Sequence, residues 1–283
     1  MKYKGRRQSS NIDDRRSRNA APTALGGVGL IVALVFAILN KDLGLLLNLG
    51  MNQLGSKNTN IAFEETAEEK ELAEFVSVVL ADTEDAWHQI FEKYNLTYKE
   101  PEMVLFKNQV QSACGVASSN TGPFYCPADQ KIYSDLAFHQ DLKHKFKATG
   151  DFAMAYVVAH EVGHHVQTLI GITDDVNKYR NKLSEKEFNK ILKRQELQAD
   201  YLAGVWAYYL KQENVLDVND INEAIEAAAS VGDDRIQEMS MGYVVPDNFT
   251  HGTPKQSVRW FKEGFTYGDL EHGDTFSLDE NEL

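Results

Sequence analysis

The feature that most constrains this chain is the stretch "AHEVGHHVQ", residues 159–167, where three histidines and a glutamate lie within six positions. The surrounding apolar residues predict a helix over 151–169. On a helix, His160 and His164 share a face, so two imidazoles can converge on one metal ion. Glu161 projects elsewhere and can reach a water molecule on that ion. The alternative is an amphipathic helix with incidental histidines, and His165, off the shared face, is expected at the surface or around the ligands.

A second segment, "RQELQADYLAG" at residues 194–204, offers a third ligand on a helix expected over 185–212. Glu196 can complete a His, His, Glu set and leave the fourth position of one zinc ion per chain to water. Asp200 lies one turn later and can accept the outer N–H of a ligand imidazole. The alternative, two carboxylates on a solvated face, is disfavoured because strongly apolar residues follow and a buried carboxylate pair needs a counter-charge.

The N-terminal part combines a basic head with an apolar run. Residues 1–19 hold seven Lys or Arg side chains against Asp13 and Asp14, and residues 24–39 contain neither a charge nor a proline. Extended to 20–40, the run is long enough to cross a bilayer core of ~30 Å. A buried core helix and a cleaved signal peptide are the alternatives, but the run lacks a polar face and a small-residue cleavage site. We therefore expect a transmembrane signal anchor in the cell membrane, a single pass, with the head in the cytoplasm and the body outside.

Beyond the anchor, we expect a linker over 41–63, a main domain over 64–267 and an acidic, disordered tail over 268–283. Helical spacing recurs in most of the main domain, and extended patterns occur only within 101–115 and 122–135. The predicted fold class is α+β, mainly helical, with a single N-terminal transmembrane helix and a small β-sheet. Helices are expected over 64–94, 135–148, 151–169, 185–212 and 218–230.

Two further features bear on compartment and partners. Cys114 and Cys126 bracket a Gly/Ser/Asn/Pro-rich stretch. Outside the cytoplasm they predict a disulfide, and in a reducing compartment two buried thiols. The net charge of −13 argues against nucleic acid as the main partner. The segment "PFYCPADQKIY" is expected to supply an edge strand onto which an extended peptide adds. Nothing in the sequence sets the oligomeric state.

These motifs carry a resemblance to a known family. "HEVGH" followed by "ELQAD" resembles the gluzincin metallopeptidases, and the E-x-x-A-D form is similar to the CAAX prenyl protease and HtpX-like families. With "GPFYCPADQKIYSDL", "ELQADYLAGVWA" and "PDNFTHGTPKQSVRWFKEG", nearly the whole chain resembles the YpfJ-like neutral zinc metallopeptidases. The resemblance implies a zincin-like metallopeptidase domain, with His160, His164 and Glu196 as zinc ligands and Glu161 as base and acid.

The expected activity is hydrolysis of a protein or peptide substrate. The oxyanion needs a second electrophile, and the sequence leaves four candidates open: His251, Tyr201, Tyr243 and Arg259. Two other classes of function stay open. One is a zinc hydrolase acting on a non-peptide amide, for example in the cell wall. The other is a non-catalytic, zinc-stabilised membrane protein that binds a partner, which the intact Glu161 disfavours.

Overall fold

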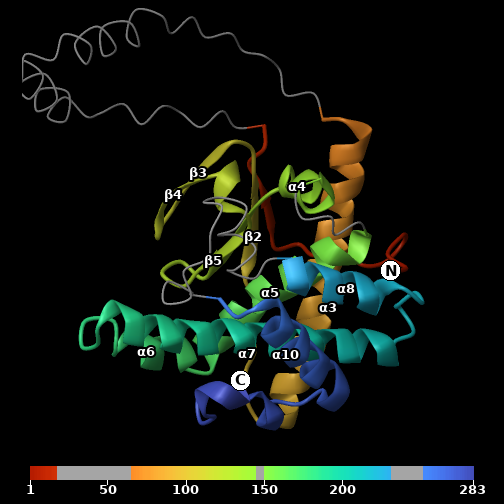
Figure 1. Cartoon of the computed structure of the whole chain (residues 1–283). Helices are drawn as coiled ribbons and strands as arrows, with labels where there is room; N and C mark the ends of the chain where they lie inside the picture. Colours follow the sequence, from red (N-terminus) through yellow and green to blue (C-terminus); the bar gives the residue numbers. More distant parts are fainter. Residues whose placement is uncertain (18–64, 145–149, 231–250) are drawn as a thin grey trace, which may run out of the picture. The chain divides into compact units, whose positions relative to one another are not determined.

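The computed structural model describes residues 1–17, 65–144, 150–230 and 251–283. The described residues within 1–15 and 66–283 form one compact unit, in which helices pack beside a small sheet (Figure 1). Among the described residues there are seven α-helices and six strands. The domain is therefore a mixed α/β structure in which both kinds of element contribute to the core.

The main sheet has four strands in the order β1-β2-β6-β5. β1 (Ile12–Asp14) pairs in parallel with β2 (Glu102–Phe106), and β2 pairs in parallel with β6 (Lys131–Asp135). β5 (Phe124–Cys126) pairs antiparallel with β6 and ends the sheet, so that its outer side is an edge. β3 (Gln109–Ser112) and β4 (Gly115–Ser118) form a separate hairpin. Strands thus occur in both segments where the sequence predicts them.

The long helices begin at strong N-terminal signals. Capping boxes start α3 (Ala67–Lys93), α7 (Glu185–Gln212) and α10 (Pro254–Tyr267), with Thr66, Ser184 and Thr253 as the capping residues. α5 (Asp151–Leu169) and α7 have the bounds that the sequence predicts. The remaining helices are α4 (Phe138–His144), α6 (Ile172–Asn177) and α8 (Asp220–Ser230). α6 and α10 were not predicted.

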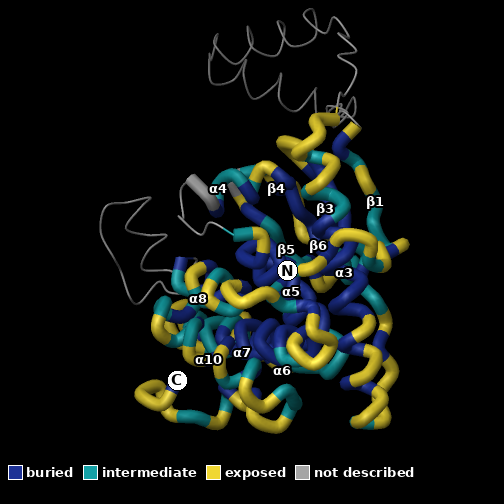
Figure 2. The backbone as a smooth tube through the Cα atoms, turned by 90° about the vertical axis from the view of Figure 1, so that its right-hand side faces the viewer, coloured by how far each residue is buried: buried dark blue, intermediate teal, exposed yellow. Residues whose placement is uncertain are grey.

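α5 is the central helix of the unit. Its residues 152–159 are all buried, and α5 contacts α3, α7 and α8 as well as β5 and β6 (Figure 2). α7 approaches it closely at Gly163, where a Cβ atom would lie 3.0 Å from the carbonyl oxygen of Ala199. This close approach brings the histidines of α5 beside the acidic residues of α7.

The prediction of a membrane anchor is wrong on two findings. Across residues 1–17, 65–144, 150–230 and 251–283, no helix is both long and apolar enough to cross a bilayer. In addition, β1 belongs to the predicted basic head and pairs with β2 of the body. Head and body therefore lie together, which contradicts a single pass that separates them. The predicted anchor (20–40) and linker (41–63) themselves lie outside the described residues. The predicted fold class and the predicted cell-membrane location are corrected accordingly.

The acidic tail, expected to be disordered, is packed against α7. Arg194 donates a hydrogen bond to the carbonyl of Thr275, and the Thr275 hydroxyl donates to the carbonyl of Arg194. Thr275 is completely buried. Two short 3-10 turns, Glu271–Gly273 and Glu280–Glu282, shape the tail. Composition alone did not reveal these contacts, because each joins a side chain to a backbone carbonyl of a segment that is distant in sequence.

Candidate metal centre

Three side chains of α5 and α7 converge on one point. The Nε2 atoms of His160 and His164 lie 3.3 and 3.2 Å from the same oxygen, Oε2 of Glu196. One ligand atom from each residue lies within 4.8 Å of the others. Two imidazoles and a carboxylate form a donor set that suits zinc and leaves a further coordination position for water. The residues present therefore fit the zinc ion that the sequence motif implies.

The other nitrogen of each histidine is held by a buried partner. His160 Nδ1 lies 3.0 Å from Oδ1 of Asp200, and His164 Nδ1 lies 2.9 Å from Oε1 of Gln167. Both acceptors require a proton on Nδ1 of the neutral ring, and that tautomer leaves both Nε2 lone pairs directed at the shared point. Asp200 has the position that the sequence predicts. Gln167 was missed, although it follows His164 by three residues on the same helix.

These partners are anchored in turn. The Tyr156 hydroxyl donates to Asp200, and Tyr156 lies one helical turn before His160. Gln167 Nε2 donates to the carbonyl of Gln195 and to the side chain of Gln198. Such outer contacts fix the orientation of the rings before any metal binds.

Glu161 lies beside this cluster and faces the sheet. It is buried, and the backbone N–H of Tyr125 on β5 is close enough to help stabilise its charged form. Burial raises the pKa of Glu161, although His164, His160 and the Tyr125 N–H act to lower it. A carboxylate with a raised pKa is a stronger base than an exposed one, as proton transfer near neutral pH requires.

The charges of the cluster favour a cation. Burial acts to raise the pKa of Glu196, but His164, His251 and His160 outweigh it and hold that pKa well below its usual value. Burial acts to lower the pKa of His160, yet Asp200 and Glu196 hold it well above its usual value. Without a metal the site therefore retains protons, which a divalent cation would displace.

His165 does not lie on the surface. It is fully buried, with Nε2 lying 2.6 Å from the carbonyl oxygen of Lys99 and Nδ1 lying 3.1 Å from the Tyr125 hydroxyl. The side of α5 away from the ligands is covered by β5 and the segment before β2, so a histidine there is enclosed. His165 thus packs the helix against the strand that also contacts Glu161.

Of the four candidates for an electrophile, the structure brings one to the cluster. His251 Nε2 lies 3.5 Å from Glu196 Oε2, and the side chain is 42% exposed. Tyr201 is buried and donates to Asp269, and Arg259 donates to the carbonyl of Glu282. Tyr243 lies outside the described residues.

The predicted disulfide is present between Cys114 and Cys126. Cys126 is the last residue of β5, and Cys114 lies in the turn of the β3–β4 hairpin. The bond therefore ties the hairpin to the strand that contacts Glu161.

Comparison with known proteins identifies relatives of this chain and a family. The chain is 44% identical over 289 residues to the uncharacterized protein YpfJ of Escherichia coli K12, covering 98% of this chain and 99% of the relative. It is 45% identical over 191 residues to the uncharacterized protein Rv2575 of Mycobacterium tuberculosis H37Rv, covering 64% of each. No solved structure matches significantly. Residues 1–276 match the family described as "Putative neutral zinc metallopeptidase". The chain therefore belongs to that zinc metallopeptidase family.

Proposed function

We propose that the protein is a zinc-dependent peptidase, with His160, His164 and Glu196 as the zinc ligands and Glu161 as the general base. The observation that carries this proposal is the convergence of both Nε2 atoms on one Glu196 oxygen, with both Nδ1 atoms already bonded. The membership of a metallopeptidase family supports the same reading.

Each residue has a role that its position supports. When bound, zinc supplies a Lewis acid that lowers the pKa of water and polarises the scissile carbonyl. The carboxylate of Glu161 takes a proton from the attacking water and passes it to the leaving amine. Asp200 and Gln167 hold the two imidazoles in the tautomer that presents Nε2. His251, half-exposed beside Glu196, is placed to donate a hydrogen bond to the developing oxyanion.

The substrate binds, in this proposal, as an extended chain along the outer edge of β5. No other strand of the described residues pairs with that edge, and the backbone N–H of Tyr125 on β5 acts on the carboxylate of Glu161. A peptide that adds to this edge by backbone pairing would bring its own carbonyl groups alongside the general base. Recognition through the backbone favours a peptide over an isolated amide.

The test compares wild type with Glu161→Gln on a broad peptide library, with bound zinc measured in each. We expect cleavage by wild type, a loss of at least about 100-fold in Glu161→Gln, and unchanged zinc content, since Glu161 is not a ligand. His164→Ala should lose the metal as well as activity. Full activity in Glu161→Gln would contradict the proposal, and so would a wild-type protein that hydrolyses cell-wall amides but no peptide.

A further inference from the structure

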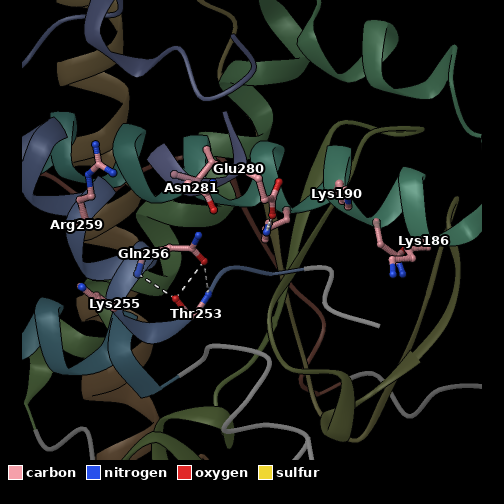
Figure 3. A pocket seen from close by; sticks show the side chains of 11 residues that line it. Lys186, Lys190, Thr253, Lys255, Gln256, Arg259, Glu280 and Asn281 are labelled. Carbon is pink, nitrogen blue, oxygen red and sulfur yellow. Dashed lines mark hydrogen bonds and ion pairs between the residues drawn. The ribbon is translucent and has the colours of Figure 1, made fainter. Parts of the chain in front are cut away.

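A basic groove lies between the first half of α7 and the start of α10. It encloses about 580 Å³, and the tail residues Glu280, Asn281 and Leu283 contribute to its lining. Figure 3 shows Glu280 and Asn281 beside the groove. Five cationic side chains line it, and Glu280 is the one acidic side chain among the lining residues that the structure describes. They are Lys186, Lys190, Lys193, Lys255 and Arg259.

These cations are arranged by helical spacing. Lys186, Lys190 and Lys193 follow one face of α7 at intervals of four and three residues, and Lys255 and Arg259 are four residues apart on α10. The whole chain has 29 basic and 42 acidic residues, with a net charge of −13. A cluster of five positive charges in so acidic a protein runs against the general composition and indicates a specific anionic ligand.

The protein's own tail shows which anion the groove accepts. The carboxylate of Glu280 pairs with Lys193, and its other oxygen lies 3.7 Å from Arg194. Arg259 donates to the main-chain carbonyl of Glu282. A carboxylate and a peptide carbonyl are thus already bound at one wall, by the same residue types that line the remainder.

The groove adjoins the candidate metal centre along both of the helices that flank it, α7 and α10. Lys193 precedes Glu196 by one helical turn on α7, and Thr253 on the other wall follows His251 by two residues. Lys186 is ten residues before Glu196, which corresponds to ~15 Å along the helix axis. An extended peptide covers ~15 Å in about five residues. A chain leaving the metal centre would therefore place its next few side chains among the lysines.

We propose that this groove binds an acidic stretch of the polypeptide substrate, within about five residues of the bond that is cleaved. The proposal rests on the peptidase function above and adds a preference for Asp- and Glu-rich sequences. A peptide is favoured over a nucleic acid because the groove is short and the rest of the molecule is strongly acidic, which would repel a long polyanion.

The test measures binding without turnover, in the full-length Glu161→Gln background. A fluorescein-labelled decapeptide of alternating Glu and Gly is titrated by anisotropy against its Gln/Gly counterpart. The triple variant Lys186→Gln, Lys190→Gln, Lys255→Gln removes three groove charges. The matched triple variant Lys4→Gln, Lys70→Gln, Lys178→Gln removes three charges that do not line it. We expect the acidic peptide to bind about tenfold more weakly to the groove variant and equally well to the matched variant. Its binding to the protein with an intact groove should weaken at high salt.

Several outcomes would overturn the inference: no binding of the acidic peptide, equal loss in both triple variants, or tighter groove-dependent binding of a thymidine oligonucleotide of equal charge. A wild-type enzyme that cleaves library peptides with no enrichment of Asp or Glu would also overturn it, and would leave the peptidase function standing. Absence of any peptide cleavage would instead contradict the proposed function, whichever way the binding experiment falls.

Discussion

At the residue scale, the candidate site depends on side chains that do not face the metal. Asp200 and Gln167 each accept a hydrogen bond from the Nδ1 of one ligand histidine. They differ in charge, so the imidazole of His160 has an anionic partner and that of His164 a neutral one. His160 is therefore the more basic of the two ligands. The ability of His164 to bind zinc depends more on the orientation that its hydrogen bond to Gln167 gives the imidazole ring.

That dependence makes Gln167→Leu informative. The change removes the acceptor from His164 Nδ1 at a fully buried position. We expect zinc affinity to fall by about 10- to 100-fold, as is typical when such a partner is lost. Competition with a chelator measures it. Gln198→Leu is the control, because Gln198 contacts Gln167 but no ligand. If both variants lost equal affinity, the effect would be one of packing.

His165 gives a prediction about pH. Burial lowers the pKa of His165 in the folded protein, whereas an unfolded histidine titrates near ~6.5. As the pH falls through ~6.5, His165 gains a proton in the unfolded chain but not in the folded one. The contribution of neutral His165 to the stability of the fold is therefore complete above that pH and is lost below it. Urea unfolding at pH 7.5 and 5.5 should show a smaller acid-induced loss for His165→Gln than for wild type. An identical loss in both proteins would contradict this assignment.

The sequence predicts the site residues that obey helical spacing and misses those that depend on neighbouring elements. His160 and His164 on one helix, and Glu196 and Asp200 on another, follow from intervals of four residues. The burial of His165 could not be predicted, because the elements that cover it, β5 and the segment at Lys99, are remote in sequence. Gln167 had a local signal, its interval of three from His164, but a polar residue at that spacing is equally typical of an exposed face.

At the element scale, the disulfide supports the edge strand. Its loop spans 12 residues, for which the chain-entropy account gives a stabilisation of ~3 kcal/mol. The double variant Cys114→Ser, Cys126→Ser should lower the unfolding free energy by about that amount. If β5 binds substrate, KM should rise more than kcat falls, since β5 carries no reacting group. Reduction with a phosphine, which binds zinc weakly, should reproduce both effects in wild type and have none on the double variant. A fall in kcat alone would argue against β5 as the substrate strand.

α7 and α10 cross so closely that there is no space for a side-chain atom at Gly264. A Cβ at Gly264 would lie 1.9 Å from the carbonyl oxygen of Tyr201, a distance that forces the helices apart. We expect Gly264→Ala to cost at least about 3 kcal/mol of unfolding free energy, the upper part of the range for overpacking. Thr266→Ala, at an exposed position of the same helix, should change stability by less than ~0.5 kcal/mol. Comparable urea midpoints for the two variants would show that α10 can shift without cost.

Helix prediction succeeded where a long periodic pattern was present and failed for α10. The residues Thr253, Pro254 and Gln256 form a recognisable N-terminal signal, with a capping box and proline at the first position. The sequence nevertheless did not predict α10, because its apolar face is narrow. Two contacts of that face with α7 require a glycine, so the face does not show a continuous row of apolar side chains. β1 offered still less, since two of its three residues are aspartates.

At the scale of the whole molecule, the N-terminal residues are part of the domain. Arg6 pairs with Asp82 and Arg7 with Glu84, both of which are buried carboxylates of α3. A basic head before an apolar run is typical of a membrane topology signal, and these arginines share that pattern. The long-range pairing of β1 with β2 and the ion pairs of Arg6 and Arg7 distinguish the two interpretations, and no local pattern encodes them.

The double variant Arg6→Ala, Arg7→Ala tests this role. It removes the cationic partners of the buried Asp82 and Glu84, although Glu84 keeps its hydrogen bonds from Ser9 and Asn11. We expect a loss of about 2–3 kcal/mol of unfolding free energy, below the ~3–5 kcal/mol of a fully enclosed pair, because both guanidiniums are partly exposed. Burial raises the pKa of Asp82 to about 7 even beside Arg6, so the loss should be larger at pH 8, where the stranded carboxylate is charged, than at pH 5. Lys2→Ala, Lys4→Ala removes the same charge from the same segment and should cost less than ~0.5 kcal/mol. Equal losses of unfolding free energy in the two double variants would mean that the segment acts through its net charge. If both double variants were as stable as wild type, the N-terminal residues would be dispensable for folding.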